Sequence, residues 1–168
     1  MGKSALTAQI ADNIYGMGGR VAFFPIEVGL KGFARNIASM HTSTDTWKLR
    51  GGKGHHQSEA EQTSLLAYLE LQRKGIFVTS IAKTPRGVET VLRDMISEHG
   101  GLDAVFIDHL QEMCLDKQSG RDTRHYEIEH ILAEIRRMAR EFNVPIVLAA
   151  QVGRSSEGRE PTIAEIKD

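Results

Sequence analysis

Short apolar runs alternate along the chain with segments in which apolar residues recur every three or four positions. The runs have the length of β-strands and lie at 20–27, 75–81, 102–109 and 144–151. Helical spacing marks the segments between them: 5–17, 29–41, 58–74, 84–99 and 128–142. In the first helix the recurring positions are Leu6, Ile10, Ile14 and Met17. Apolar runs that alternate with helices are typical of a parallel sheet covered on both faces, so the pattern predicts an α/β fold with four or more, mainly parallel, strands.

Composition fits an ordinary globular protein and limits its class. The 168 residues suit one domain, so we expect 1–168 to fold as a unit with a loose polar tail at 152–168. A net charge of −1 argues against a histone-like nucleic-acid binder, but not against loops that grip DNA. The single cysteine, Cys114, excludes an internal disulfide. No apolar run approaches the ~18–20 residues of a membrane span, so we expect a cytoplasmic protein without membrane contact.

The candidate chemistry lies at the ends of the predicted strands, where open α/β sheets bind their ligands. These ends carry Glu27, Asp108 and Gln151, and Met-Gly-Lys-Ser at the head of the first helix adds Lys3 and Ser4. Gly-Lys-Ser running into a helix is how a phosphate-binding P-loop ends. Lysine and backbone N–H groups would hold phosphates, and serine with aspartate would hold Mg²⁺. Glu27 would then polarise the attacking water, and Gln151 would sense the γ-phosphate.

Each of these signals has an ordinary structural explanation when it is taken alone. Gly-Lys-Ser occurs by chance in many proteins, and an apolar run that ends in aspartate is more often a plain strand end. Glu27 and Gln151 would by default be solvated turn and strand-end residues. The order of the signals along one predicted fold is what favours a nucleotide site.

Two further groups of side chains favour a structural explanation. The histidines have no zinc-type spacing with cysteine. The neighbouring ones are His55 with His56, in a Gly-rich loop, and His125 with His130, which are off one helical face. The basic group formed by Arg136, Arg137 and Arg140 fits the solvated face of a helix better than a DNA-binding patch.

Several longer stretches share the pattern of one known family. "MGKSALTAQIADNIY" matches the S-M-G-K-[ST] end of a Walker A motif with its helix, and "VAFFPIEVG" is similar to F-x-S-L-E-M. "EHGGLDAVFIDHLQEM" is close to H-G-x-x-L-I-x-I-D-Y-L-Q-L-M, and "NVPIVLAAQVGR" is close to N-V-P-V-x-A-L-S-Q-L-N-R. On these residues the chain resembles the C-terminal RecA-like ATPase domain of DnaB-family replicative DNA helicases over nearly its whole length.

The resemblance implies a RecA-like P-loop NTPase core that binds ATP and Mg²⁺ and couples hydrolysis to translocation along single-stranded DNA. It makes Glu27 and Gln151 catalytic, and Ser4 and Asp108 ligands of Mg²⁺. The implied nucleotide contacts are Gly2, Lys3, Ser4 and Arg154. Lys167 and Asp168 fall on a loop that holds DNA in the central channel of the family's hexameric ring.

The chain departs from the family pattern at several points. The strand and loop that begin Walker A are absent before Gly2, as if the chain began at an internal methionine. The family's arginine finger lies beyond the last residue, so low ATPase activity is expected of this chain alone, since such a finger contributes ~10³–10⁵ in rate. Pro25, Val28, His109 and Gly153 stand where the family has Ser, Met, Tyr and Asn.

The missing first P-loop strand leads to an expectation about the sheet. The resemblance places that strand between "DAVFID" and "PIVLAA", so each of these would lose a partner. Unpaired buried backbone groups cost about 1–3 kcal/mol apiece, so the gap must close or be filled. We expect self-association, as a dimer or another oligomer, rather than direct pairing of the two strands.

Two other functions remain open from the sequence. One is a RecA-fold ATPase of the KaiC-like or RadA-like type, which shares the fold but lacks the I-D-Y-L-Q-L-M run. The other is a non-catalytic interaction module that keeps the fold without ATP turnover. Binding of Mg-ATP separates an ATPase from the interaction module.

Overall fold

A parallel sheet lies at the centre of the molecule. The computed structural model describes residues 2–42, 66, 70, 75–79, 82–115 and 124–151. The strands within them are β1 (Val21–Pro25), β2 (Ile76–Val78), β3 (Ala104–Asp108) and β4 (Ile146–Leu148). They form one sheet in the order β2-β1-β3-β4, and every neighbouring pair is parallel. The predicted parallel α/β architecture is confirmed.

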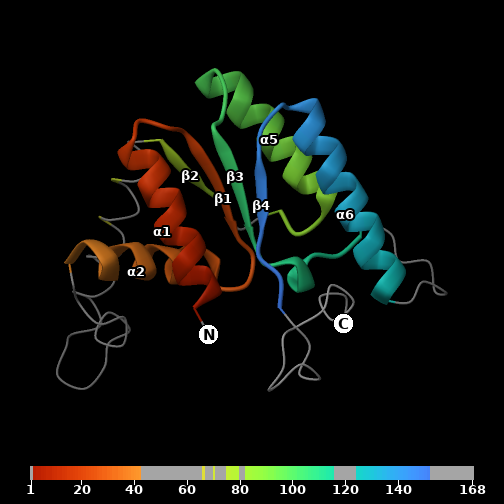
Figure 1. The fold of residues 1–168 in the computed structure, drawn as a ribbon, viewed down its shortest axis with the longest axis horizontal. Coiled ribbons are helices and arrows are strands. Elements are labelled where there is room, and N and C mark those ends of the chain that lie inside the picture. Colours follow the sequence, from red (N-terminus) through yellow and green to blue (C-terminus); the bar gives the residue numbers. More distant parts are fainter. Residues whose placement is uncertain are drawn as a thin grey trace.

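Helices cover both faces of this sheet (Figure 1). On one face lie α1 (Lys3–Gly16) and α2 (Gly29–Thr42). On the other lie α5 (Pro85–His99) and α6 (Arg124–Glu141), and a short 3₁₀ helix, η1 (Leu110–Glu112), follows β3. Between β2 and β3 the chain returns to the opposite end of the sheet through α5, and between β3 and β4 through α6, which is how parallel strands are connected.

The two faces carry separate apolar cores because side chains alternate along each strand. Phe23 and Phe106 point to the α1/α2 side, where Phe33 packs against Phe23. Phe24 and Ile107 belong to the core under α5 and α6. Every residue of β1 and β3 is buried, as expected of central strands that are covered on both faces.

The ends of α5 follow from local chemistry. Thr84 caps its N-terminus by accepting a hydrogen bond from the Gly87 backbone N–H at 3.1 Å, and Pro85 occupies the first helical position. Gly100 ends the helix with φ 77°, a left-handed conformation that glycine adopts without strain. The sequence signals at 84–85 and 100–101 therefore marked this helix correctly.

Ion pairs tie the exposed sides of α5 and α6 together. Glu89 accepts hydrogen bonds from Arg93 and from Arg137, and Glu141 contacts the same two arginines. The Arg93 guanidinium, followed by that of Arg137, holds the pKa of Glu89 below its usual value. Surface pairs of this kind each contribute only about 0–1 kcal/mol to stability.

The apolar positions of α1 lie on an unexpected side of the helix. Leu6 and Met17 are exposed, at 62% and 81%, and the buried residues are Thr7, Ala8 and Ala11. Small side chains let the helix approach the sheet closely, and the Thr7 hydroxyl is satisfied by the carbonyls of Lys3 and Ser4. The spacing predicted the helix, but it did not identify the face that packs.

The prediction that the third and fourth strands would not pair directly is wrong. β3 and β4 pair directly, with Val105 opposite Ile146 and Ile107 opposite Leu148. Since no slot separates them, the gap gives no reason for self-association. In the described part of the chain β4 forms one edge of the sheet and β2 the other, each with a single neighbouring strand.

Several predictions fall outside the described residues: the helix at 58–74 except for two of its positions, the tail at 152–168, and Arg154, Lys167 and Asp168. Among the helices that the structure describes, none combines the length and the apolar character needed to cross a bilayer.

Candidate functional site

The first helix starts at the end of the sheet where the strands finish. α1 runs into β1 through a short turn, so the two are antiparallel and the head of α1 lies beside the carboxyl end of β1. Figure 1 shows this end at the bottom of the view, where β3 and β4 also finish. The structure therefore places Lys3, Ser4, Glu27, Asp108 and Gln151 at one end of the sheet. Their roles stay predictions.

The head of α1 offers backbone donors rather than a side-chain cap. Gly2 occupies the cap position with φ 123°, a conformation that a residue with a side chain rarely adopts. Among the described residues, no side chain caps the helix and no acidic residue lies in its first turn. The first N–H groups and the positive end of the helix dipole are thus available to an anion next to Lys3 and Ser4.

Three polar side chains converge where β1 and β3 end. Pro25 pairs with Asp108, and Glu27, two residues after Pro25, lies beside His109, which follows Asp108. The His109 Nδ1 atom lies 2.8 Å from Glu27 Oε2, and the Glu27 backbone N–H donates to the Asp108 carbonyl at 3.1 Å. One ligand atom from each of the three residues, a carboxylate oxygen or an imidazole nitrogen, lies within 4.8 Å of the other two.

The Asp108 carboxylate has an unusual environment. The residue is fully buried, and neither carboxylate oxygen has a hydrogen-bond partner among the described residues. Buried polar atoms are normally satisfied, and a buried carboxylate normally has a cationic partner. A divalent cation fits this requirement, because Mg²⁺ is usually held by one or two carboxylates together with substrate phosphates.

Gln111, which no sequence pattern singled out, holds Gln151 in place. Its amide donates from Nε2 to the Gln151 carbonyl at 2.9 Å, and its Oε1 accepts from the Gln151 backbone N–H at 3.0 Å. This two-point contact joins the segment after β3 to the segment after β4. The signal was present in "IDHLQEM", where the glutamine sits in the most specific of the quoted motifs.

Replacing Gln111 by alanine should speed hydrogen exchange at the Gln151 amide about two- to tenfold, the equivalent of one net hydrogen bond of about 0.5–1.5 kcal/mol. Exchange measured by NMR or mass spectrometry checks this. Gln111→Glu is the matched control, because its carboxylate still accepts from the Gln151 N–H and should keep much of the protection. Equal exchange in the alanine variant and the unmodified chain would show that the contact does not order this segment.

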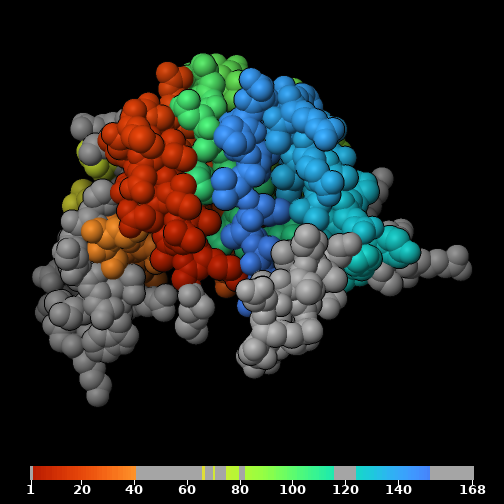
Figure 2. Space-filling model, viewed as in Figure 1, coloured from red at the N-terminus to blue at the C-terminus, as the bar shows by residue number. Residues whose placement is uncertain are grey.

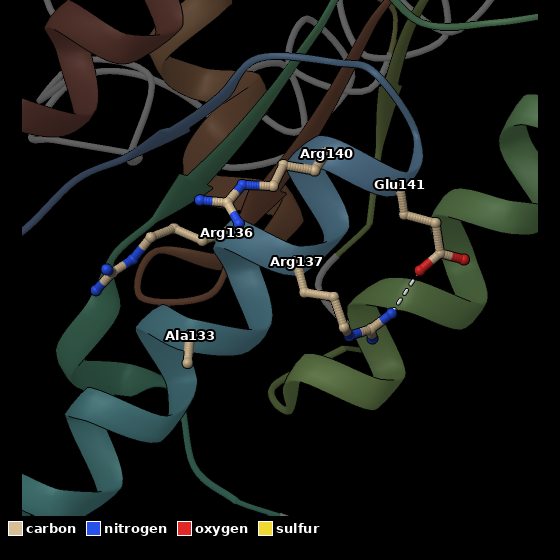
Figure 3. Close-up of a pocket in the computed structure, with 5 residues that line it drawn as sticks. All are labelled: Ala133, Arg136, Arg137, Arg140 and Glu141. Carbon is tan, nitrogen blue, oxygen red and sulfur yellow. Dashed lines mark hydrogen bonds and ion pairs between the residues drawn. The ribbon is translucent and has the colours of Figure 1, made fainter.

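The basic group on α6 is largely engaged within the protein. Figure 3 shows Arg136, Arg137 and Arg140 around an open hollow that Ala133 and Glu141 also line. Arg137 pairs with carboxylates of Glu89, Glu134 and Glu141, and Arg136 donates to a carbonyl of its own helix. This arrangement agrees with a solvated helix face rather than a patch reserved for phosphates.

Comparison with known proteins decides the family. Residues 1–168 match the family described as DnaB-like helicase C terminal domain. The chain belongs to this family. Because this family model covers the whole chain, a KaiC-like or RadA-like ATPase is no longer needed to explain the fold.

The relatives carry names of the same kind. The replicative DNA helicase DnaB of Helicobacter pylori is 29% identical over 171 residues, and that of Synechocystis sp. is 30% identical over 175 residues. A probable plasmid replicative DNA helicase of Chlamydia psittaci is 26% identical over 172 residues. All three alignments cover 100% of this chain, but only 34%, 19% and 37% of the relatives. The chain thus spans little more than a third of the length of these relatives at most.

Solved structures show the same fold. A structure described as an ATPase domain superposes with a TM-score of 0.80 at 23% identity, and the match covers 99% of this chain and 60% of that one. A DnaB-like replicative helicase, solved in a study of its interactions with primase, gives the same TM-score, and the match covers 42% of that chain. The predicted RecA-like fold is therefore confirmed.

Proposed function

We propose that this chain is the ATP-binding and ATP-hydrolysing motor domain of a replicative-type DNA helicase. The observation that carries the proposal is the buried Asp108 carboxylate at the strand ends, which has no hydrogen-bond partner among the described residues. It lies next to Glu27 and at the same end of the sheet as the head of α1. Family membership supports it, because the named relatives are replicative DNA helicases.

The proposed roles follow from the positions of the side chains. Lys3 and the first N–H groups of α1 hold the phosphates, and Ser4 and Asp108 hold Mg²⁺. Mg²⁺, when bound, neutralises charge on the phosphate oxygens. Glu27, which is about half exposed, accepts a proton from the attacking water, and Gln151 contacts the γ-phosphate from the neighbouring strand.

The partners are part of the same proposal. Single-stranded DNA is the polymer on which the motor acts, and self-association into a ring is the assembly, as the resemblance implies. Arg154 would contact nucleotide, and Lys167 and Asp168 would contact the DNA backbone. Such contacts bind without sequence preference.

Mg-ATP should raise the melting temperature of the purified chain. A ligand at 100 times its Kd stabilises the native state by about 2.7 kcal/mol, which is measurable by a thermal shift. Lys3→Ala should abolish most of the shift, because it removes a side-chain cation from the head of α1. Arg136→Ala, which removes an exposed cation from α6, is the control and should keep the shift.

A non-catalytic interaction module predicts a different result. Such a protein would melt at the same temperature with and without Mg-ATP, and Lys3→Ala would change nothing. That outcome would exclude the ATPase and leave the fold assignment intact.

A further inference from the structure

We propose that Glu27, Asp108 and His109 form a three-ligand site that binds Mn²⁺, Co²⁺ or Zn²⁺ in preference to Mg²⁺. The ligands are two carboxylates and one imidazole nitrogen, His109 Nδ1. The inference deepens the proposed function and rests on it in assigning Asp108 to a cation. It adds a nitrogen ligand that a magnesium site does not use.

The spacing of the three ligand atoms suits one small ion. Metal–ligand bonds to these groups are about 2.0–2.2 Å, so ligands at right angles on one ion lie about 3 Å apart and opposite ligands about 4.0–4.4 Å apart. Glu27 Oε2 and His109 Nδ1 are 2.8 Å apart, and all three atoms lie within 4.8 Å of one another. The largest of these separations exceeds the distance between opposite ligands by no more than about 0.4–0.8 Å, and the exposed Glu27 side chain can close that difference.

The burial of the ligands shows which parts are fixed. The side chains of Asp108 and His109 are almost entirely buried at the end of β3, whereas that of Glu27 is 47% exposed. Two rigid ligands and one adjustable carboxylate can close on an ion without moving the sheet. The exposed carboxylate also leaves a route by which an ion enters.

Unsatisfied polar atoms point to a missing partner at this place. Both oxygens of Asp108 and the Nδ1 atom of His109 are buried and have no hydrogen-bond partner among the described residues. The close approach of Nδ1 and Glu27 Oε2 does not have the geometry of a hydrogen bond, although it is near enough for an ion pair when the imidazole is protonated. One divalent cation would satisfy all of these atoms at once.

The imidazole decides which cation is favoured. Mg²⁺ prefers oxygen ligands, whereas imidazole suits Zn²⁺ and other first-row transition ions. The DnaB motif quoted above has tyrosine at this position, whose phenol carries its proton at neutral pH and is a poor ligand. His109 is therefore the residue that changes the metal preference of the site.

Titration of the nucleotide-free chain with Mn²⁺ tests the proposal. The electron paramagnetic resonance signal of free Mn²⁺ should fall as the ion binds. Added Mg²⁺ should displace bound Mn²⁺ with an affinity for the site at least tenfold lower than that of Mn²⁺. His109→Tyr should weaken Mn²⁺ binding at least tenfold and leave the weaker Mg²⁺ binding almost unchanged. Asp108→Asn should weaken the binding of both ions. His125→Asn is the matched control, since His125 also lies beside a carboxylate, Glu129, but outside this cluster.

A second measurement uses the unmodified chain, so it does not require any variant to fold. Pulsed electron paramagnetic resonance of bound Mn²⁺ should show coupling between the ion and an imidazole nitrogen. Equal Mn²⁺ affinity in His109→Tyr and His125→Asn, or bound Mn²⁺ without nitrogen coupling, would overturn the proposal. The contact with Glu27 would then be a plain ion pair. Because no nucleotide is present, this failure is separate from failure of the Mg-ATP thermal shift, which tests the proposed function.

Discussion

Replacing Phe106 by alanine should lower the free energy of unfolding by about 3–5 kcal/mol, the usual cost of emptying a buried aromatic site. Phe106 is fully buried in the central strand β3, and its ring stacks on that of Phe23 with centroids 5.7 Å apart. A loss of this size is a large part of the ~5–15 kcal/mol that holds a domain folded. Urea denaturation followed by circular dichroism measures it.

Tyr126→Ala is the control for this substitution. Tyr126 is 63% exposed at the start of α6, so its removal should change stability by no more than about 0.5 kcal/mol. Similar denaturation midpoints for the two variants would mean that Phe106 does not lie in the core.

Replacing Asp108 by asparagine should have two effects of opposite sign. In EDTA the variant should be more stable than the unmodified chain by roughly 1–3 kcal/mol, because a buried carboxylate that has no partner among the described residues is replaced by a neutral amide of the same shape. With Mg-ATP at 1,000 times its Kd the order should reverse, because the variant loses a stabilisation of about 4.1 kcal/mol, which exceeds its gain in EDTA. Chemical denaturation under both conditions measures the two effects.

Asp103→Asn is the matched control. The Asp103 carboxylate accepts a hydrogen bond from the Arg20 backbone N–H at 2.7 Å, so its neutralisation should bring no gain in EDTA and should not alter the response to Mg-ATP. If Asp108→Asn instead destabilises the metal-free protein as Asp103→Asn does, the Asp108 carboxylate has a hydrogen-bond partner outside the described residues, and the prediction is wrong.

The sequence predicts the elements of this fold better than their arrangement. Periodicity locates β1 and β3 because both are buried on two faces and read as unbroken apolar runs. It contains no information on which strands are neighbours, so the direct pairing of β3 with β4 was missed. It also misled at Leu6 and Met17, which are exposed, whereas the buried positions of α1 are the small residues Thr7, Ala8 and Ala11.

At the candidate site, too, the sequence predicts single residues but not the contacts between them. Asp108 could be predicted from its place at the end of an apolar run, and Gln151 from the end of the next. The contact between His109 and Glu27 depends on the register that pairs Pro25 with Asp108, which no local pattern specifies. Gln111 was missed for a similar reason, since its amide acts on the backbone of a residue 40 positions away.

The direction of a strand that pairs with the outer edge of β4 determines which kind of assembly can form. Figure 2 shows β4 at the surface on the same face as α1, and Val147 is 38% exposed. A second copy that pairs β4 with β4 about a two-fold axis must run antiparallel, which closes the assembly at two chains. A strand that continues the pattern of the sheet must run parallel, and the β2 edge of another copy in that position would extend the sheet without limit. The direction of the strand beside β4 thus distinguishes a closed dimer from both a completed sheet and an open filament.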